Sequence, residues 1–237
     1  STAISLSNIE FSWESSKSDF QLEINNFQLQ KQESGVLIGP SGAGKSTLLN
    51  LICGTIGPNA GTITVLGESI ENKSQSKKDS FRADHLGIIF QQFNLVPYLS
   101  AIDNVLLPLH FSSNRKNKSG QTLSKLITEA ERLLRALGIT PEKLGRQKAN
   151  TLSIGQQQRV AAARAFIGSP ELIIADEPTS SLDEKSQDEF IDQLFSQKEI
   201  TGATLLMVTH NARVTKKFDK VIKLKDICAT SFTEEKT

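Results

Sequence analysis

The sequence has almost no net charge, which limits the partners that it can attract. Its 237 residues include 27 Lys and Arg and 26 Asp and Glu, so the net charge is +1. A protein without an overall positive charge has no long-range attraction to the phosphate backbone of nucleic acids. We therefore expect no nucleic acid as a partner, and a dedicated DNA-binding protein is disfavoured.

Long apolar runs are also missing. No run approaches the roughly 18 to 20 residues that a helix needs to cross a bilayer, and the first residues lack the charged-then-apolar pattern of a secretion signal. Any contact with a membrane must therefore go through a partner protein.

Cysteine is scarce, since only Cys53 and Cys228 are present. Two cysteines are too few for a disulfide framework or a metal site, and a reducing cytoplasm fits such a chain. Hydrophobic residues, in contrast, make up 38% of the sequence, which is enough for a sizeable core. The length allows one large α/β domain or a core with a subdomain.

The most informative stretch is glycine-rich and ends in Lys-Ser-Thr. Its members are Gly39, Pro40, Ser41, Gly42, Ala43, Gly44, Lys45, Ser46 and Thr47. The apolar residues 35–38 before it predict a buried parallel strand, and residues 48–52 after it predict a helix. Backbone N–H groups of such a loop point at phosphate oxygens, Lys45 adds a positive charge, and the Ser46 hydroxyl can ligate Mg²⁺. We therefore expect a nucleoside triphosphate as ligand.

Two apolar runs precede this loop and predict strands joined by a hairpin. They cover residues 4–11 and 20–29, and the polar residues 14–19 separate them. Trp13 follows the first run and is a candidate to stack its ring on adenine. Packing in the core or at its rim is an equal alternative for Trp13, and Phe11 is the competing aromatic residue.

The segment after the loop ends on a pair of glutamines. Residues 62–67 predict a short strand, residues 71–80 a solvated loop, and residues 86–90 a second buried strand that runs into Gln91 and Gln92. In a parallel sheet the carboxyl ends of the strands face the ligand crevice. Gln91 is therefore a candidate to sense Mg²⁺ or the attacking water, with Gln92 next in line and an ordinary strand-end amide as the alternative.

Strand patterns then stop, and residues 101–150 predict a mainly helical insertion. Apolar residues recur at helical spacing over 123–137, which indicates a long amphipathic helix. The basic segment 112–120 is expected to be a loop, and Thr140 with Pro141 predicts the start of a short helix.

The remaining candidate residues follow a helix start and two buried strands. Ser153 and Gln156 have the spacing of a capping box. The apolar run 172–175 ends on Asp176, which suits Mg²⁺ coordination, and Glu177, which suits activation of a water molecule. Pro178 favours an extended backbone at Glu177. The apolar run 203–209 ends on His210 at the same edge of the predicted sheet.

Together these motifs resemble the ATP-binding-cassette (ABC) ATPases over nearly the whole chain. GPSGAGKS resembles the Walker A motif, LSIGQ the signature, LIIADE the Walker B motif and SSLD the D-loop. The stretch FQQFNLVPYLSAIDNVLLPL is similar to the ATPase subunits of the macrolide-exporter and lipoprotein-release group, which also includes relatives that act in cell division. Ile154 departs from the pattern, because the usual signature has glycine there, and a β-branched residue narrows the backbone conformations.

The resemblance implies a fold and a set of site residues. The fold is α/β, a P-loop NTPase core with a mainly parallel sheet, an antiparallel β part near the N-terminus and a helical subdomain insertion. The single domain 1–237 would comprise a core (1–91 and 170–237) and a Q-loop with helical subdomain (92–169). The implied catalytic residues are Glu177, His210, Gln91 and Lys45. The implied nucleotide contacts are Trp13, residues 39–47, Ser153, Gly155 and Gln156. The implied Mg²⁺ ligands are Ser46, Gln91 and Asp176.

The resemblance also implies an activity and partners. We expect an ATP hydrolase that forms a head-to-tail dimer with a second copy and drives a separate integral membrane permease. ATP would lie between the Walker A loop of one copy and the signature of the other. The alternatives are a cassette ATPase of a non-transport complex, either of the cell-division type or a soluble ATPase that acts on DNA or ribosomes.

Overall fold

The computed structural model describes residues 1–13 and 21–228. The chain divides into two compact units: residues 1–78 with 206–237, and residues 79–205. The division falls inside helix α2 (Gln75–His85) and strand β8 (Thr204–Thr209). We describe the two units separately.

The first unit contains an antiparallel sheet near the N-terminus. Its strands lie in the order β2, β1, β4, β5, with bounds Gln21–Gln30, Thr2–Ser12, Ala60–Val65 and Glu68–Ser69. In the pairing of β1 with β2, Leu6 lies opposite Phe27. Alternate residues of both strands are buried, as expected for a sheet with one face in the core. The predicted pairing of the two N-terminal strands is therefore confirmed, while the expected turn at 14–19 lies outside the described residues.

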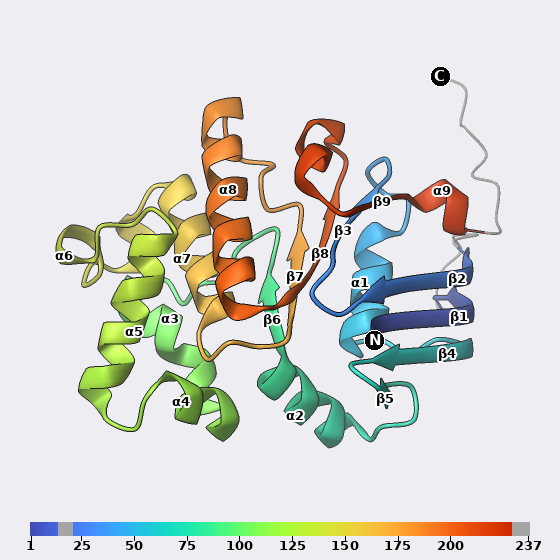
Figure 1. Cartoon of the computed structure of the whole chain (residues 1–237), viewed down its shortest axis with the longest axis horizontal. Helices are drawn as coiled ribbons and strands as arrows, with labels where there is room; N and C mark the ends of the chain where they lie inside the picture. The colour runs from blue at the N-terminus through green and yellow to red at the C-terminus, as the bar shows by residue number, and fades with distance from the viewer. Residues whose placement is uncertain (14–20, 229–237) are drawn as a thin grey trace. The chain divides into compact units, whose positions relative to one another are not determined.

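The same unit holds the strand and helix that flank the glycine-rich loop. Strand β3 (Ser34–Ile38) pairs in parallel with β9 (Lys220–Lys223), and helix α1 (Lys45–Cys53) follows the loop. Figure 1 shows α1 beside the antiparallel strands, and α1 contacts β4. The 3₁₀ helix η3 (Ala212–Lys217) and the short helix α9 (Leu224–Ile227) complete the unit. The strand–loop–helix context predicted for residues 35–52 is therefore confirmed.

The second unit combines a parallel strand pair with a set of helices. Strands β6 (Leu86–Ile89) and β7 (Leu172–Asp176) pair in parallel. The helices of the insertion are α3 (Ala101–Leu106), η1 (Leu107–His110), α4 (Ser113–Ser119), α5 (Leu123–Ala136), α6 (Pro141–Leu144) and η2 (Ala149–Thr151). Helices α7 (Ile154–Phe166) and α8 (Glu184–Thr201) flank β7 in the chain. The expected helical insertion is therefore confirmed.

Three helices of this unit pack on one another. Helix α3 packs on α5 and α7, and α5 also packs on α7. Helix α5 buries Leu126, Ala130, Leu133 and Leu134 on one face, as its periodicity predicts. Among the described residues, no helix is both long and apolar enough to cross a bilayer.

Two segments expected to be loops are helical instead. Residues 75–80 belong to α2, which buries only Phe81 and is supported by an ion pair between Arg82 and Asp79. Residues 113–119 form α4, where the Ser112 hydroxyl caps the helix by accepting from the Arg115 N–H at 3.1 Å. Each helix depends on one buried side chain, Phe81 or Arg115, inside a polar sequence, so the hydrophobic pattern does not reveal it.

Candidate functional site

The glycine-rich loop forms a tight turn between β3 and α1. Gly42 and Gly44 have φ angles of 79° and 99°, and Gly44 is the N-cap of α1. Positive φ is readily adopted by glycine and strained for other residues, so the sequence needs glycine at both positions. The first turn of α1 presents backbone N–H groups that lie outside the helix's own hydrogen-bond ladder. The loop therefore has the backbone geometry of an anion-binding helix start.

Lys45 is held over this loop by the loop's own carbonyl groups. Its side chain is buried, with 6% of its surface exposed, and Nζ donates to the carbonyl oxygens of Gly39 and, at 3.2 Å, Pro40. A buried ammonium group needs such acceptors because burial without a partner is costly. The positive charge is thereby fixed at the loop, while Ser46, next in the chain, is exposed.

His210 lies near the same loop. It follows β8 directly and lines a pocket of about 280 Å³ in the first unit. The pocket is lined by Ile38, Gly39, Pro40, Ala43, His210, Lys223, Leu224 and Lys225. The structure therefore brings His210 together with the start of the loop, whereas Trp13 is not among the residues that line this pocket.

Trp13 and Phe11 differ in exposure. Phe11 is buried, with 7% of its surface exposed, whereas Trp13 is 47% exposed. The two rings make an edge contact with centroids 4.9 Å apart. Phe11 thus supports Trp13 from the core side, and Trp13 is the ring that offers a surface for stacking.

In the second unit, Gln91 and Glu177 follow adjacent strands at the same edge. Ile89 of β6 lies opposite Ala175 of β7 in parallel register. Gln91 lies two residues after Ile89, and Glu177 lies two residues after Ala175. Asp176 is the last residue of β7. The structure therefore places Gln91, Asp176 and Glu177 at the carboxyl ends of two paired strands, the usual position of ligand-binding residues in α/β sheets.

The backbone of Glu177 is not extended. Its φ angle is 45°, in the left-handed region, so the expectation that Pro178 holds it extended is wrong. The Ser180 N–H donates to the Glu177 carbonyl at 3.3 Å, which shows that the chain turns here and overrides the local preference. Glu177 is also 8% exposed. A buried acidic residue in a left-handed backbone costs free energy, and such strain is typical of functional positions.

The signature begins helix α7 with the predicted capping box. The Ser153 hydroxyl accepts from the Gln156 N–H at 3.2 Å, and the Gln156 side-chain oxygen accepts from the Ser153 N–H at 2.9 Å. Both groups at the helix start are thus satisfied, and Ser153 remains exposed. Gly155 lies beside Leu182, because a Cβ built on Gly155 would lie 3.4 Å from a Leu182 methyl group. The signature and the D-loop therefore lie side by side.

The D-loop is held by a residue that the sequence did not single out. Gln187 Nε2 donates to the carbonyl oxygens of Thr179 and Leu182, at 3.2 and 2.8 Å. Asp183 caps α8 by accepting from the Ser186 N–H at 2.9 Å, and this hydrogen bond lowers the pKa of the Asp183 carboxyl. The sequence signal for Gln187 is its place in the first turn of α8, just after the D-loop.

Two more polar residues of this unit are buried and were missed. Asn104 in α3 is 0% exposed, and Arg164 in α7 is 8% exposed. Both hydrogen-bond the backbone that follows Gln91. Their signal in the sequence is a polar residue inside an apolar run, since buried polar groups are costly unless they are hydrogen-bonded.

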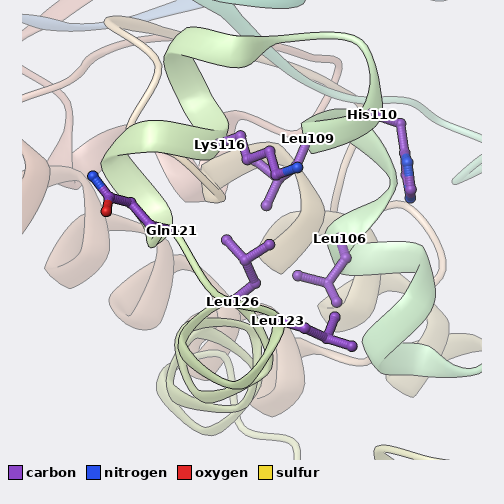
Figure 2. A pocket seen from close by; sticks show the side chains of 7 residues that line it. All are labelled: Leu106, Leu109, His110, Lys116, Gln121, Leu123 and Leu126. Atoms are coloured by element: carbon purple, nitrogen blue, oxygen red, sulfur yellow. The ribbon is translucent and has the colours of Figure 1, made fainter.

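The helical insertion also contains a small pocket. Its volume is about 200 Å³, and Figure 2 shows Leu106, Leu123 and Leu126 close together, with Lys116 beside Leu109. His110 and Gln121 complete the lining. No residue predicted for the nucleotide site lines this pocket.

The fold and these residues define a P-loop nucleoside triphosphatase. A glycine-rich loop with a buried lysine lies between strand and helix, and a paired strand ends on two carboxylates. Comparison with known proteins identifies the family. A family model described as ABC transporter matches residues 22–180, and the chain belongs to this family.

Individual relatives agree with this assignment. An ABC transporter ATP-binding protein of Mycobacterium tuberculosis is 36% identical over 222 residues, covering 93% of this chain and 86% of that protein. The macrolide export ATP-binding/permease protein MacB of Rhodopirellula baltica is 36% identical over 200 residues, covering 84% of this chain and 28% of that protein.

A solved structure supports the fold. The cassette MJ0796 of Methanocaldococcus jannaschii, in a dimeric post-hydrolysis state bound to ADP and Pi, has a TM-score of 0.82 and 33% identity, and 94% of each chain is covered. The chain is therefore an ATP-binding and ATP-hydrolysing ABC cassette with the P-loop NTPase fold, similar to the macrolide-exporter and lipoprotein-release group. The fold class and the family resemblance seen in the sequence are confirmed.

Proposed function

We propose that this ATPase drives a separate integral membrane permease through ATP-dependent, head-to-tail dimerisation. The observation that carries the proposal is the exposure of the signature. Ser153 is exposed at the start of α7, and Ile154 beside it is a large apolar residue with 58% of its surface exposed. A single exposed apolar side chain is normal on a protein surface, so the support comes from the position of Ile154 inside the signature motif, beside the exposed Ser153. A second copy of this chain is the partner that would place ATP against Ser153 and Gly155.

The relatives support both partners. The similar cassette MJ0796 is described as dimeric and bound to ADP and Pi, and MacB is described as an ATP-binding/permease protein, of which this chain matches 28%. We propose that the permease is a separate polypeptide. We propose that this partner holds the protein at the inner face of the cell membrane.

We propose a role in hydrolysis for the site residues of each unit. Lys45 and the backbone of residues 39–47 bind the phosphates, and Trp13 stacks on adenine. Glu177 orients the attacking water and accepts its proton, and His210 and Gln91 respond to the terminal phosphate. Phosphoryl transfer depends mainly on positioning and charge, which these residues supply.

The donors proposed for Mg²⁺ match its chemistry. Ser46, Gln91 and Asp176 offer hydroxyl, amide and carboxylate oxygen atoms, and Mg²⁺ prefers oxygen ligands. When bound, the ion would neutralise phosphate charge.

Replacing Glu177 tests the proposed mechanism. Glu177→Gln removes the base but keeps the shape, so turnover should fall by roughly 10² to 10⁴-fold while ATP binding persists. The variant should form a dimer with ATP that is stable on a sizing column. A Glu177→Gln protein that stays monomeric at saturating ATP, or that hydrolyses ATP normally, would contradict the mechanism.

The permease contact is tested at the loop that follows Gln91. Tyr98 is 70% exposed in this loop, and we propose that it belongs to the surface on which a cytoplasmic segment of the permease docks. Tyr98→Glu should leave the ATPase activity of the isolated protein unchanged but abolish its recovery with native membranes. Leu95→Glu serves as a comparison for folding, because Leu95 is half-buried. Normal membrane recovery of a folded Tyr98→Glu protein would exclude this docking surface.

A further inference from the structure

Arg164 connects the signature helix to the backbone that follows Gln91. Its guanidinium donates to the carbonyl oxygens of Asn94, at 2.7 Å, and Phe93. The side chain is 8% exposed, and burial lowers its pKa to about 10, so the group remains charged at neutral pH. Hydrogen bonds from a buried charged group are stronger than those between neutral groups. The helix that begins at Ser153 is thus bonded directly to this loop.

The two acceptor residues have an unusual backbone. Phe93 and Asn94 have φ angles of 60° and 52°, in the left-handed region, where residues other than glycine are uncommon. This conformation turns two successive carbonyl groups toward Arg164, and a planar fork of N–H donors matches such a pair. The hydrogen bonds to Arg164 therefore offset the strain of the left-handed backbone at Phe93 and Asn94.

Asn104 in α3 holds the rest of the same loop. Its side-chain oxygen accepts from the Val96 N–H at 2.8 Å, and its amide nitrogen donates to the carbonyl oxygens of Val96, at 3.0 Å, and Leu99, at 3.3 Å. The residue is fully buried. The loop from Phe93 to Ser100 is therefore fixed from α7 and from α3, and these two helices pack on each other.

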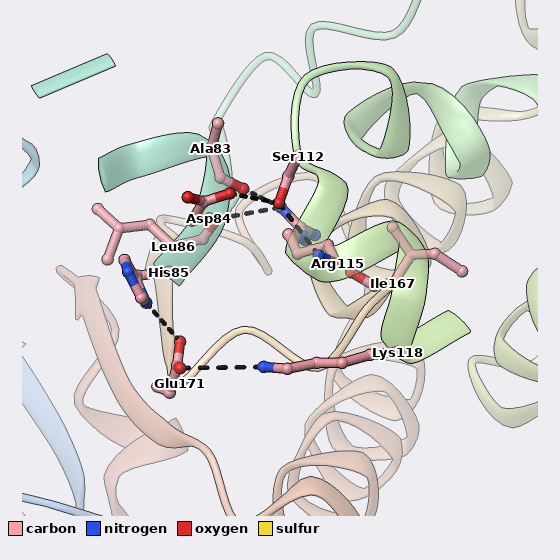
Figure 3. A network of polar contacts seen from close by, with 9 residues as sticks. All are labelled: Ala83, Asp84, His85, Leu86, Ser112, Arg115, Lys118, Ile167 and Glu171. Carbon is pink, nitrogen blue, oxygen red and sulfur yellow. Dashed lines mark hydrogen bonds and ion pairs between the residues drawn. The ribbon is translucent and has the colours of Figure 1, made fainter. Parts of the chain in front are cut away.

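A second buried arginine fixes the other end of the signature helix. Figure 3 shows Arg115 of α4 in a network of polar contacts that includes Ile167 and Leu86. Arg115 donates to the carbonyl oxygens of Ala165 (3.1 Å) and Ile167 (2.8 Å) at the end of α7, and of Leu86 (3.3 Å) at the start of β6. A positive charge is favourable at the carboxyl end of a helix. Helix α7 is therefore attached to the start of β6 and, through Arg164, to the residues after β6.

Gly168 makes this attachment possible. It has a φ angle of 75°, and a Cβ at this position would lie 2.4 Å from the Cβ of Arg115. Only glycine permits the backbone after α7 to approach α4 so closely.

From these contacts we propose that Arg164 is a positioning residue: it makes the loop Phe93–Ser100 and the signature helix with Ser153 move as one body. The proposal deepens the proposed function and rests on it in one respect, namely that the loop carries the permease contact and Ser153 the dimer contact. A permease segment that displaces the loop would then displace Ser153, because sliding of the loop along α7 would break buried hydrogen bonds of a charged group.

Spin labels on the loop and on the signature test the coupled movement in the monomer. Tyr98→Cys and Ile154→Cys provide two exposed label sites, and Cys228→Ser removes the native cysteine that is half-buried, while Cys53 is buried. The distance distribution between the labels should be narrow in this background. Arg164→Met should broaden the distance distribution. Arg164→Lys should broaden it less, because lysine keeps the positive charge but lacks the planar pair of N–H donors.

A variant of the loop tests the same contact without replacing the buried arginine, in case the arginine variants misfold. Asn94 is exposed, and Asn94→Val places a β-branched residue at a φ angle of 52°, which should displace the carbonyl group from Arg164. Asn94→Gly is the matched control, because glycine accepts this angle. Valine should broaden the label distance and glycine should not. A narrow distribution in both Asn94→Val and a folded Arg164→Met protein would overturn the inference.

Dimerisation distinguishes this inference from the proposed function. In the Glu177→Gln background, Arg164→Met and Asn94→Val should weaken ATP-dependent dimerisation by about tenfold or more, with ATP affinity of the monomer unchanged. If Glu177→Gln alone does not dimerise, the proposed function fails and the label distances still decide the role of Arg164. If Glu177→Gln dimerises and the added variants dimerise equally well, the role of Arg164 as a positioning residue is refuted.

Discussion

The rings of Phe11 and Trp13 meet edge to face, with centroids 4.9 Å apart and an interplanar angle of 86°. Phe11 is buried and Trp13 is about half exposed. The buried ring therefore contacts the exposed ring from the core side, and the rest of the Trp13 ring offers a surface for stacking. This arrangement favours Trp13 over Phe11 as the ring that stacks on adenine.

The first prediction concerns Trp13. Trp13→Ala should weaken ATP binding by about 5- to 150-fold, because stacking of a base on an aromatic ring contributes roughly 1–3 kcal/mol. Trp13→Phe should retain most of the affinity. Isothermal titration calorimetry with ATP measures the affinities of both variants. If Phe11→Leu weakens binding and Trp13→Ala does not, Phe11 is the stacking residue.

The second prediction concerns Lys45. Lys45→Ala should reduce ATP affinity as well as turnover, because it removes charge-assisted hydrogen bonds worth roughly 1.5–3 kcal/mol. A fluorescent ATP analogue reports the affinity. Lys223→Ala is the matched control, since Lys223 lines the pocket beside the loop and should matter less. Equal losses in the two variants would mean that general positive charge, and not the position of Lys45, binds the phosphates.

The third prediction concerns the signature. Ser153→Arg should block ATP-dependent dimerisation and leave nucleotide binding by the monomer intact, because a bulky cation would lie in the interface. Ser153→Ala controls for the lost helix cap, which alone costs about 1 kcal/mol of stability. Ile154→Gly should have only a mild effect on turnover. Light scattering with and without ATP measures dimerisation. A Ser153→Arg protein that dimerises normally would contradict a site formed by the Walker A loop of one copy and the signature of the other.

The fourth prediction concerns Glu171 and pH. Partial burial of its carboxyl group tends to raise the pKa, but the hydrogen bond with His85 (3.1 Å) and the charge of Lys118 (3.9 Å) contribute to a net lowering. Because the pKa is lower in the folded protein, the stabilisation is present above the unfolded value of about 4.3 and is lost as the pH falls through the folded pKa.

Glu171→Gln should therefore lower the free energy of unfolding at pH 7 by less than about 1 kcal/mol, since the group is half exposed and screened by solvent. Denaturant unfolding at pH 7 and near pH 3 measures the effect. The difference between the variant and the parent protein should shrink at the lower pH. A difference that stays constant with pH would show that the carboxylate charge does not contribute.

The local parts of this protein follow from short stretches of its sequence. The capping box of Ser153 and Gln156 and the turn at Gly42 and Gly44 depend on residues close together in the chain, so their spacing is sufficient. The buried face of α5 follows from its periodicity in the same way.

Other features depend on residues that are distant in the chain and meet only in the folded protein. Helix α4 is held by Arg115, whose acceptors lie around residues 86 and 167, and no local pattern shows them. The left-handed backbone of Glu177 opposes the preference set by Pro178 and is imposed by the turn after β7. Arg164 is one polar residue among alanines, and only folding brings it to Phe93 and Asn94. A buried charge takes its role from the acceptors that surround it, and those come from elsewhere in the chain.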